Sequence, residues 1–433
     1  MTQAEVPARP PWWFQSVFFF IRSAPPLTNT QWSLLGLLGL TLQINHYDFA
    51  ILTLALPQIQ AGLAIPEEDI GRVMATIRLG VLPAFLLAFL ADRAGRRRLL
   101  IVTILGFTLC TAATAFARDA VQFQTFQFLA RMFIAAEEML AIVVLTEELD
   151  AKTRGFGLGM LAAFGALGFG TAALALALVN VLPFGWRALY LVGAAPLLWI
   201  AWLRRRVPET RRFAEHRASQ HGQAGLASAL RPLRELVSRY PRRMIALCAA
   251  ISSAALVAIT ASGFVSKYLQ DVQGWQPGQV TLLYGVAGFL VFVSTILAGT
   301  LADRFGRRKV MATALLMNAA GIACFYHTSG AWIIAAWVVM TTGGVAIDTL
   351  FGALGSELFP TSYRSTASGV RSAAGTTGGS AGLWLEGTLF PLTGSHAASI
   401  TWMLGLAWIA PLVVLLFLPE TARRELEEIA PTT

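Results

Sequence analysis

Long apolar runs alternate with short polar segments from residue 32 to residue 418. A run of about 20 apolar residues can cross a bilayer core of roughly 30 Å as a helix, which satisfies its own backbone hydrogen bonds in lipid. The pattern therefore predicts an all-α membrane protein. Six spans precede a basic stretch and six follow it, at roughly 32–58, 70–91, 99–117, 123–146, 155–181, 186–203, 244–268, 278–302, 309–327, 331–356, 365–391 and 397–418.

Composition supports the same class. Of the 433 residues, 56% are hydrophobic and 13% are charged, and the mean hydropathy is +0.61. A soluble domain carries about 25% charged residues, so a soluble multidomain enzyme is excluded. A disordered chain is excluded as well, because such chains are poor in apolar residues. The three cysteines, all inside apolar runs, offer neither a disulfide framework nor a metal-binding spacing.

The net charge of +9 comes from basic residues placed between the apolar runs. If both termini are cytoplasmic, 26 of the 33 basic residues lie on the cytoplasmic side, 11 of them in the segment 204–243. Loops that set membrane orientation have this asymmetry. We therefore expect a multi-pass protein with cytoplasmic termini and no nucleic-acid partner. The excess of Arg over Lys is typical of GC-rich bacterial genomes and suggests a bacterial inner (cell) membrane.

Three local patterns recur at an offset of 210 or 211 residues. Asp92-Arg93-Ala94-Gly95-Arg96-Arg97 returns 211 residues later as Asp303-Arg304-Phe305-Gly306-Arg307-Arg308. Glu147…Arg154 returns as Glu357…Arg364, and Pro208-Glu209-Thr210 returns as Pro419-Glu420-Thr421. The chain is thus expected to be two six-helix pseudo-repeat bundles in the same orientation. That arrangement is found in transporters whose binding site lies between the halves.

The repeat divides the chain into five segments. They are an N-terminal segment (1–31), a first bundle (32–203), an Arg-rich cytoplasmic linker (204–243), a second bundle (244–418) and a cytoplasmic tail (419–433). In the first segment, Trp12 and Trp13 stand beside a short apolar stretch without a small-residue cleavage site. A signal peptide is not expected there. A helix lying at the membrane interface and a flexible tail both remain open.

The doubled loop resembles the signature loop of the Major Facilitator Superfamily. Its fuller copy also has the leading Gly299, which Ala88 replaces in the first copy. The resemblance implies alternating access by rocking of two bundles. The acids and bases of the repeated patterns are then expected to form a cytoplasmic latch, since Asp can cap a helix or pair with Arg. The expected gating residues are Asp92, Arg93, Arg96, Glu147, Arg154, Asp303, Arg304, Arg307, Glu357 and Arg364.

Among the ionisable residues inside the predicted spans, eight stand out. They are Asp48, Glu137, Glu138, Asp348, Glu386, Arg78, Arg131 and Arg371. Such residues cost roughly 2.5–3.5 kcal/mol each on insertion scales, so they are functional candidates by default. Five acids face three bases, and we therefore expect one or two acids to be protonated at rest. A carboxyl group that changes protonation between conformations can carry a proton.

Helix geometry separates the two adjacent glutamates. Glu138 follows Arg131 by seven residues, so the two share a face about 10.5 Å apart, with the small Ala135 between them. Glu137 is turned about 120° away from Arg131 and is expected to face a neighbouring helix. Arg131 and Glu138 can therefore face one cavity.

The pattern Arg131-x-x-x-Ala135-x-x-Glu138 resembles the fourth helix of the anion:cation symporter family, and spinster lipid transporters have a similar pattern. Asn45-His46-Tyr47-Asp48 with Pro57 is similar to the first helix of those families and of aromatic-acid:proton symporters. The resemblance implies that Asp48 and Glu138 couple protons and that Arg131 holds an anion. Phe49 stands where a basic residue usually follows the Asp, and Arg78 or Arg371 is the expected substitute.

We therefore expect a proton-coupled symporter that imports a small organic anion such as a carboxylate, acting as a monomer in the bilayer. The expected proton-coupling residues are Asp48, Glu138 and Glu137. The expected substrate-binding residues are Arg131, Arg78, Arg371, Asn45, His46, Tyr47, Asp348 and Trp384. No cofactor, metal site or enzymatic activity is expected, because the chain has no nucleophile or metal constellation. An exporter or lysolipid transporter, and a membrane sensor without transport, remain alternatives.

Overall fold

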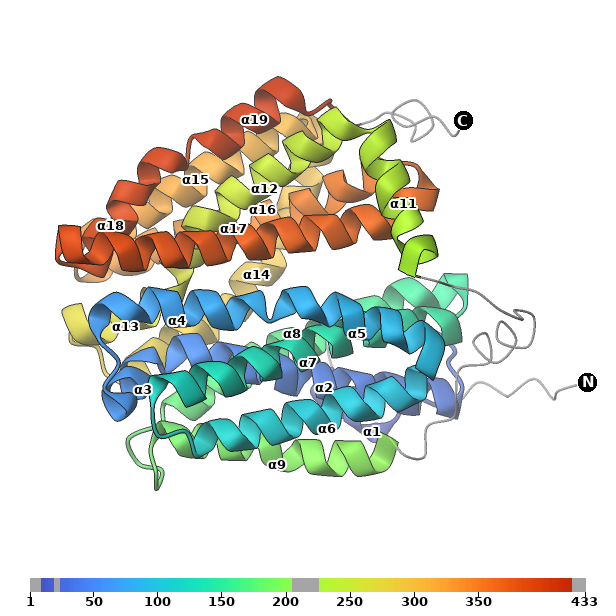
Figure 1. Ribbon diagram of the computed structural model, residues 1–433, viewed down its shortest axis with the longest axis horizontal. Coiled ribbons are helices and arrows are strands. Elements are labelled where there is room, and N and C mark those ends of the chain that lie inside the picture. The colour runs from blue at the N-terminus through green and yellow to red at the C-terminus, as the bar shows by residue number, and fades with distance from the viewer. Residues whose placement is uncertain (1–8, 19–23, 205–225, 423–433) are drawn as a thin grey trace, which may run out of the picture.

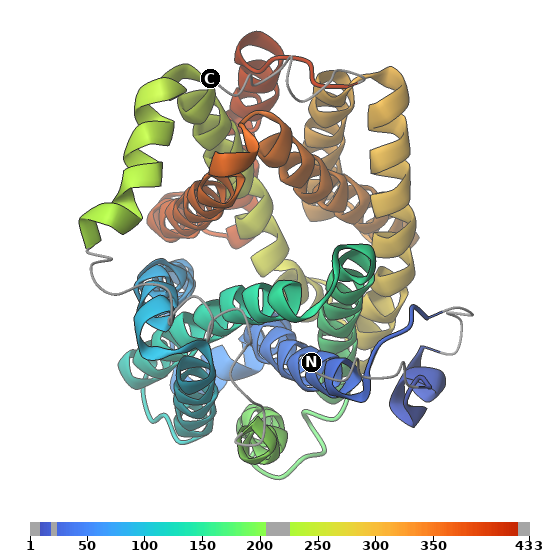
Figure 2. The same cartoon turned by 90° about the vertical axis from the view of Figure 1, so that its right-hand side faces the viewer.

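The computed structural model describes residues 9–18, 24–204 and 226–422. Every regular element in these residues is a helix, which confirms the expected all-α fold class. Figure 1 shows two layers of long helices, the first bundle below and the second above. Figure 2, turned by 90°, shows the same two bundles nearly end-on.

The first bundle contains six long segments within the described residues. The short α3 extends the first segment, and α4 and α5 together form the second. Their bounds are α2 (Asn29–Leu54), α3 (Leu56–Leu63), α4 (Glu67–Leu79), α5 (Val81–Ala94), α6 (Arg96–Ala115), α7 (Ala120–Glu148), α8 (Ala151–Leu176) and α9 (Trp186–Arg204).

The second bundle again contains six long segments in the described part of the chain. They are α12 (Pro241–Gly263), which runs into α13 (Val265–Lys267) and the π-helix η1 (Tyr268–Val272), then α14 (Pro277–Phe305), α15 (Arg307–His327), α16 (Ala331–Glu357), η2 (Thr361–Tyr363) with α17 (Arg364–Thr393), and α18 (His396–Met403) with η3 (Leu404–Leu406) and α19 (Ile409–Phe417). By length and composition, seven helices in the described residues can each cross a membrane.

Element boundaries differ from the sequence pattern in two places. The acidic residues 67–69 precede the predicted span 70–91, yet they form the first turn of α4. Negative charge is favourable there because it faces the positive end of the helix dipole. The last predicted span is a continuous apolar run, but the structure divides it into α18, η3 and α19.

Two helices lie outside the twelve long segments. α1 (Trp12–Val17) packs on the first bundle, where the Trp13 ring lies 5.8 Å from the Phe164 ring, centroid to centroid. The residues of α1 are therefore a packed helix and not a flexible tail. α11 (Leu226–Arg239) packs against the second bundle, where the Tyr363 hydroxyl donates to Glu235. Hydrogen bonds from Arg231 and Tyr363 hold the pKa of Glu235 below its usual range.

The molecule has two ends with different elements. α1 and α11 lie at one end, and α3, α13 and α18 lie at the other (Figure 1). The end that carries α1 and α11 is called proximal below, and the opposite end distal.

Glycine allows the closest helix contacts. In α17, Gly378 lies against the backbone of α12, where an added Cβ would be 2.5 Å from the Ser252 Cα. In the first bundle, Gly168 of α8 lies in the same way against the backbone of α2 at Gln43. These two helix pairs hold corresponding places in the two bundles.

Gly378→Ala is expected to lower stability by about 1–3 kcal/mol, because a methyl group would force apart two backbones that cannot yield locally. The matched control is Gly369→Ala on the same helix, where a Cβ would meet only the Phe85 ring at 3.6 Å. Thermal unfolding of the purified variants in one detergent measures the difference. Equal melting temperatures for the two variants would contradict the close packing of α12 on α17.

Candidate functional site

Arg131, in the middle of α7, is a cation with an aromatic partner. Its guanidinium carbon lies 4.3 Å from the centroid of the Phe49 ring of α2. Its Nε has no hydrogen-bond partner among the described residues. A planar guanidinium on a ring face is favoured by the ring's quadrupole and keeps its N–H groups available for a further acceptor. Arg131 is thus oriented by Phe49 and retains donor capacity.

His46 and Glu138 meet beside this cation. His46 Nε2 of α2 lies 3.6 Å from Glu138 Oε1 of α7, and both side chains are about one-third exposed, at 37% and 31%. Gly165 of α8 makes room for the imidazole, since an added Cβ would be 3.1 Å from His46 Nε2. Glu138 is therefore a carboxyl group within reach of water and of a titratable partner.

Phe169 of α8 completes an aromatic wall. Its ring packs edge-on against Phe49 at 6.1 Å and against His46 at 6.2 Å, centroid to centroid. Offset and edge-to-face arrangements are the favourable geometries for aromatic rings. Aromatic groups from α2 and α8 thus lie beside the Arg131 guanidinium.

Three more charges link the two bundles. Arg78 of α4 interacts electrostatically with Arg131 in its own bundle and with Asp348 of α16 in the other. Asp348 also interacts with Arg371 of α17. Arg78 can extend toward the second bundle because residue 379 of α17 is a glycine. A Cβ atom at Gly379 would lie 2.8 Å from the Arg78 Nε. Arg78 Nε, like Arg131 Nε, has no hydrogen-bond partner in the described part of the chain.

Of five other candidates, three make hydrogen bonds to neighbouring helices of the first bundle, while Asn45 is buried and Trp384 is exposed. Asp48 is buried, 2% exposed, and accepts a hydrogen bond of 3.0 Å from Thr111 of α6. Asn45 is fully buried. The Tyr47 hydroxyl donates to the Leu189 carbonyl of α9. Glu137 is fully buried and accepts a hydrogen bond from Thr103 of α6.

Trp384, the fifth, is 56% exposed. It follows Arg371 by 13 residues on α17, which turns it about 140° away around the helix axis. Arg371 faces Asp348 of the neighbouring α16, so Trp384 lies on the opposite side of its helix. Asp48 keeps a link to the central group, because its charge interacts with Arg131.

The three repeated patterns of the second half meet at the proximal end. Arg307 Nη2 lies 2.6 Å from Glu357 and 3.4 Å from Asp303. The Thr421 hydroxyl donates to the same Glu357. Gly306 turns the chain at φ = 100°, as Gly95 does at φ = 99° in the first copy, a region that glycine adopts without strain.

Glu420 caps α15 from the end of the chain. Its carboxylate accepts the backbone N–H groups of Arg307 and Arg308, at 2.8 and 3.2 Å. Partial burial opposes ionisation, but backbone N–H groups, including these two, outweigh it and lower the pKa of Glu420. The Asp303, Glu357 and Glu420 patterns therefore form one cluster, although they lie far apart in the sequence.

The other expected gating residues lie outside this cluster. Arg304 lies over the ring of Phe305, and Arg154 donates to the Leu149 carbonyl. Glu147 and Arg364 lie near the proximal ends of α7 and α17. The side chains of Asp92, Arg93 and Arg96 fall outside the described residues.

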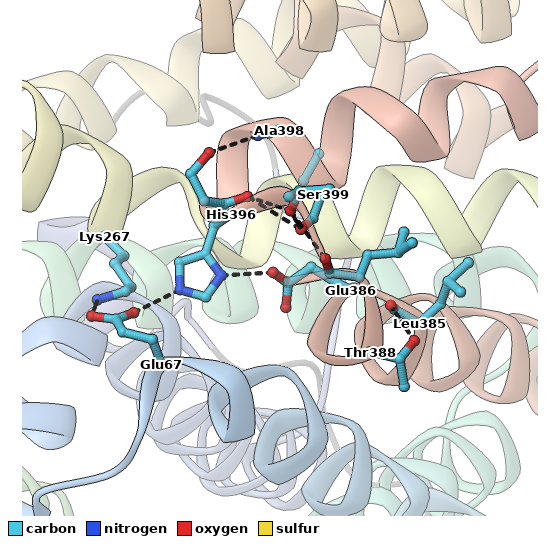
Figure 3. A network of polar contacts seen from close by, with 12 residues as sticks. Glu67, Lys267, Leu385, Glu386, Thr388, His396, Ala398 and Ser399 are labelled. Carbon is cyan, nitrogen blue, oxygen red and sulfur yellow. Dashed lines mark hydrogen bonds and ion pairs between the residues drawn. The ribbon is translucent and has the colours of Figure 1, made fainter. Parts of the chain in front are cut away.

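A second charged group at the distal end was not expected from the sequence. His396, the first residue of α18, lies between Glu67 of α4 and Glu386 of α17, and Glu67 also contacts Lys267 of α13 (Figure 3). Only Glu386 stood out in the sequence, as an acid inside a span. Nothing in the spacing linked it to the other three residues.

The chain has relatives of known class. A sequence model described as the Major Facilitator Superfamily matches residues 38–300 and 246–431. NiaP of Bacillus subtilis (strain 168), named for niacin/nicotinamide transport, is 24% identical over 404 residues, which cover 92% of this chain and 98% of that protein. The 4-hydroxybenzoate transporter PcaK of Pseudomonas aeruginosa is 24% identical over 432 residues, covering 91% and 94%. A gallate transporter of Pseudomonas putida is 24% identical over 378 residues, covering 79% and 81%.

Solved structures share the fold. A bacterial homologue of the human lysosomal transporter Spinster, inward-facing and unoccupied, superposes with a TM-score of 0.73 at 16% identity, covering 90% of this chain and 98% of that one. A D-xylose–proton symporter gives a TM-score of 0.72 at 17% identity, with coverage of 90% and 98%. At these identities the likeness concerns the fold alone.

Proposed function

We propose that this chain, which belongs to the Major Facilitator Superfamily, takes up a small aromatic or heteroaromatic carboxylate together with a proton. The family match confirms the resemblance seen in the repeated loop, and the relatives are transporters of small molecules. The protein is accordingly a multi-pass membrane transporter and not an enzyme. The proposal concerns the class of substrate, the coupling to protons and the direction of transport.

One observation carries the choice of an anion. Arg131 and Arg78 are cations of the first bundle. The Nε group of each has no hydrogen-bond partner among the described residues. Each cation inside a membrane protein is costly unless something compensates its charge. A substrate carboxylate can accept two parallel N–H bonds from the Arg131 guanidinium, which is the geometry that arginine favours. Arg371, which interacts electrostatically with Asp348, contributes positive charge from the second bundle.

The aromatic wall supports an aromatic substrate. A flat ring attached to the carboxylate would lie next to Phe49, Phe169 and His46 while the carboxylate meets Arg131. Ring pairs of this kind contribute about 0.5–1.5 kcal/mol beyond area burial. The relatives are named for niacin, 4-hydroxybenzoate and gallate, all of which carry a carboxyl group on a ring. In the families that this chain resembles, a basic residue usually stands at the position of Phe49. In the proposed site, Phe49 stacks on the substrate ring instead.

Glu138 is the proposed proton carrier, with His46 as its partner. When Glu138 is ionised, its charge competes with the substrate for Arg131, since the two side chains share one face of α7. Protonation of Glu138 from the outside removes this competition and leaves Arg131 to the substrate. The charge of the buried Asp48 also interacts with this cation. Release of the substrate inside would follow loss of the proton.

The basic proximal side is proposed to face the cytoplasm, following the distribution of positive charge. Hydrogen bonds join the two bundles at the distal end, among them Gln58 to Gln270 and Ser266 to the Leu54 carbonyl. With the distal end outside, this arrangement is the inward-facing state of an alternating-access cycle. The Arg307–Glu357–Glu420 cluster is then the cytoplasmic latch element of the second bundle.

A thermal-shift panel on the purified protein tests the proposal. The probes are nicotinate, 4-hydroxybenzoate, aliphatic carboxylates, sugars, organic cations and lysolipids, each in acidic and in basic buffer. A ligand at 100 times its dissociation constant should stabilise the fold by roughly 2.7 kcal/mol. A shift with aromatic carboxylates that is larger in acid would support the proposal. A shift only with sugars, cations or lysolipids would overturn it.

A further inference from the structure

His396 is held between two carboxyl groups from different bundles. Its Nδ1 lies 2.6 Å from Glu386 Oε1, and its Nε2 lies 2.7 Å from Glu67 Oε2 (Figure 3). Glu386 and His396 belong to the second bundle, whereas Glu67 begins α4 in the first. The imidazole packs against the ring of Phe264 at 4.4 Å and the ring of Phe390 at 4.6 Å, centroid to centroid. The aromatic rings therefore fix its plane between the two acids.

The hydrogen-bond pattern requires an additional proton. Each of the two short N···O contacts needs one hydrogen. A neutral imidazole has only one N–H group, and an ionised carboxylate has none. Either the imidazole is protonated and donates from both nitrogens, or one carboxyl group is protonated. In both cases the bridge holds one proton more than a neutral histidine with two carboxylates.

The surrounding charges favour binding of that proton. Lys267 Nζ lies 3.2 Å from Glu67 Oε1 and 2.6 Å from Asp271 of η1, and it also donates to Gln60 of α3. Arg72 of α4 is paired with Asp69 at 3.2 Å. Apart from the Arg72–Asp69 pair, the described residues around the unprotonated bridge would then hold three acids, Glu67, Asp271 and Glu386, and one cation, Lys267.

Glu386 is where the excess charge would be most costly. Its side chain is fully buried, and its Oε2 has no hydrogen-bond partner among the described residues. The Tyr326 hydroxyl of α15 is within electrostatic range, but it donates to the Ala261 carbonyl. A buried ionised carboxylate is unfavourable unless a cation or donor compensates it. The extra proton supplies that compensation through His396.

We propose that Glu67, His396 and Glu386 form a second proton-binding site, which closes the distal gate when it is occupied. This inference rests on the proposed function for its orientation and for the rocking of the two bundles. Opening of the distal end would separate Glu67 from His396 and from Lys267, because these residues lie on opposite bundles. A proton taken from the outside would therefore hold the transporter in the inward-facing state, separately from the proton on Glu138.

The sign of the pH dependence follows. Low pH fills the bridge and favours the closed distal end, and high pH empties it and favours opening. For one proton, the ratio of closed to open molecules should fall by up to about tenfold per pH unit. Glu386→Gln should remove this dependence, because a glutamine amide can donate to Nδ1 while the neutral imidazole donates from Nε2 to Glu67. The bridge of that variant is complete without an extra proton.

Distance measurements between spin labels on the full-length transporter test the proposal. The labels are placed through Ala61→Cys and Leu392→Cys, which lie on the exposed surface of the first and second bundle near the distal end. Cys110, Cys248 and Cys324 are first replaced by serine. The wild-type distance should lengthen when the buffer is changed from acidic to basic. The Glu386→Gln variant should keep the short distance throughout, and His396→Ala should show the long distance at every pH.

Two results would overturn the proposal. One is a wild-type distance that does not respond to pH, and the other is a Glu386→Gln variant with the wild-type response. Asp150→Asn, at an exposed carboxylate before α8 near the proximal end, is the matched control and should leave the distal pH response unchanged. Since no substrate enters this measurement, it can succeed even if no aromatic carboxylate binds, and its failure leaves the ligand panel unaffected. A normal melting temperature of His396→Ala shows that its long distance reflects opening and not unfolding.

Discussion

The Arg131→Ala variant is expected to lose almost all uptake of an aromatic carboxylate. The change removes the guanidinium that lies on Phe49, and no other cation stacks on that ring in the described residues. Hydrogen bonds to a charged group contribute about 1.5–3 kcal/mol each, so affinity should fall roughly 10- to 100-fold. Transport should fall at least as much, because the substrate would no longer be oriented against the aromatic wall. Uptake of labelled substrate into proteoliposomes with an acid exterior measures the loss.

Arg131→Lys is the matched control. A lysine keeps the positive charge but offers a point donor without a planar face, so it can neither form the two parallel bonds nor stack in the same way. Partial recovery by lysine would show that charge and geometry both contribute. Full uptake by Arg131→Ala, with normal pH dependence, would remove Arg131 from the substrate site and give it a structural role.

The second large effect is expected for Glu138→Gln. The amide keeps the size and hydrogen-bonding capacity of a protonated carboxyl group but cannot release a proton. Binding of substrate and exchange of internal for external substrate should persist, while accumulation driven by a proton gradient should disappear. The test compares counterflow with gradient-driven uptake in the same proteoliposomes. Accumulation that survives in this variant would show that Glu138 is not the proton carrier.

Glu137→Gln provides a neighbouring control. Glu137 is one residue away on the same helix, but it is fully buried and bonded to Thr103 of α6. Its replacement should lower stability more than coupling, since a hydrogen bond inside the first bundle would be weakened. Loss of coupling in Glu137→Gln and its retention in Glu138→Gln would exchange the roles of the two residues.

Sequence patterns correctly predicted the features that depend on a single helix or on the internal repeat. Apolar periodicity and low charge gave the membrane class and the all-α fold. The repeated loop gave the family, which the sequence comparison confirms. The spacing of Arg131, Glu137 and Glu138 on one helix predicted different faces for the two glutamates. In the structure Glu138 lies against His46, and Glu137 lies against Thr103.

Contacts between different helices could not be predicted from the sequence patterns. Tyr47 and Trp384 are expected in the substrate site from the sequence, yet the Tyr47 hydroxyl donates to the Leu189 carbonyl of α9 and Trp384 is 56% exposed. Arg78 reaches the second bundle only because Gly379 leaves space for it. Which residue meets which glycine depends on the rotation and crossing of each helix pair, and those are set by packing.

The sequence by itself determined that the chain is a two-bundle membrane transporter and that Arg131 and Glu138 share one face of a helix. The regular rise and turn of the helix fix such relations without reference to the rest of the protein. Only the tertiary structure placed Arg131 on Phe49 and brought His396 between Glu67 and Glu386, residues 329 and 10 positions away from it. Arg131 meets Phe49 because α7 packs against α2 within the first bundle, whereas Glu67 meets His396 because the two bundles lie against each other. Residue spacing along the chain specifies neither packing.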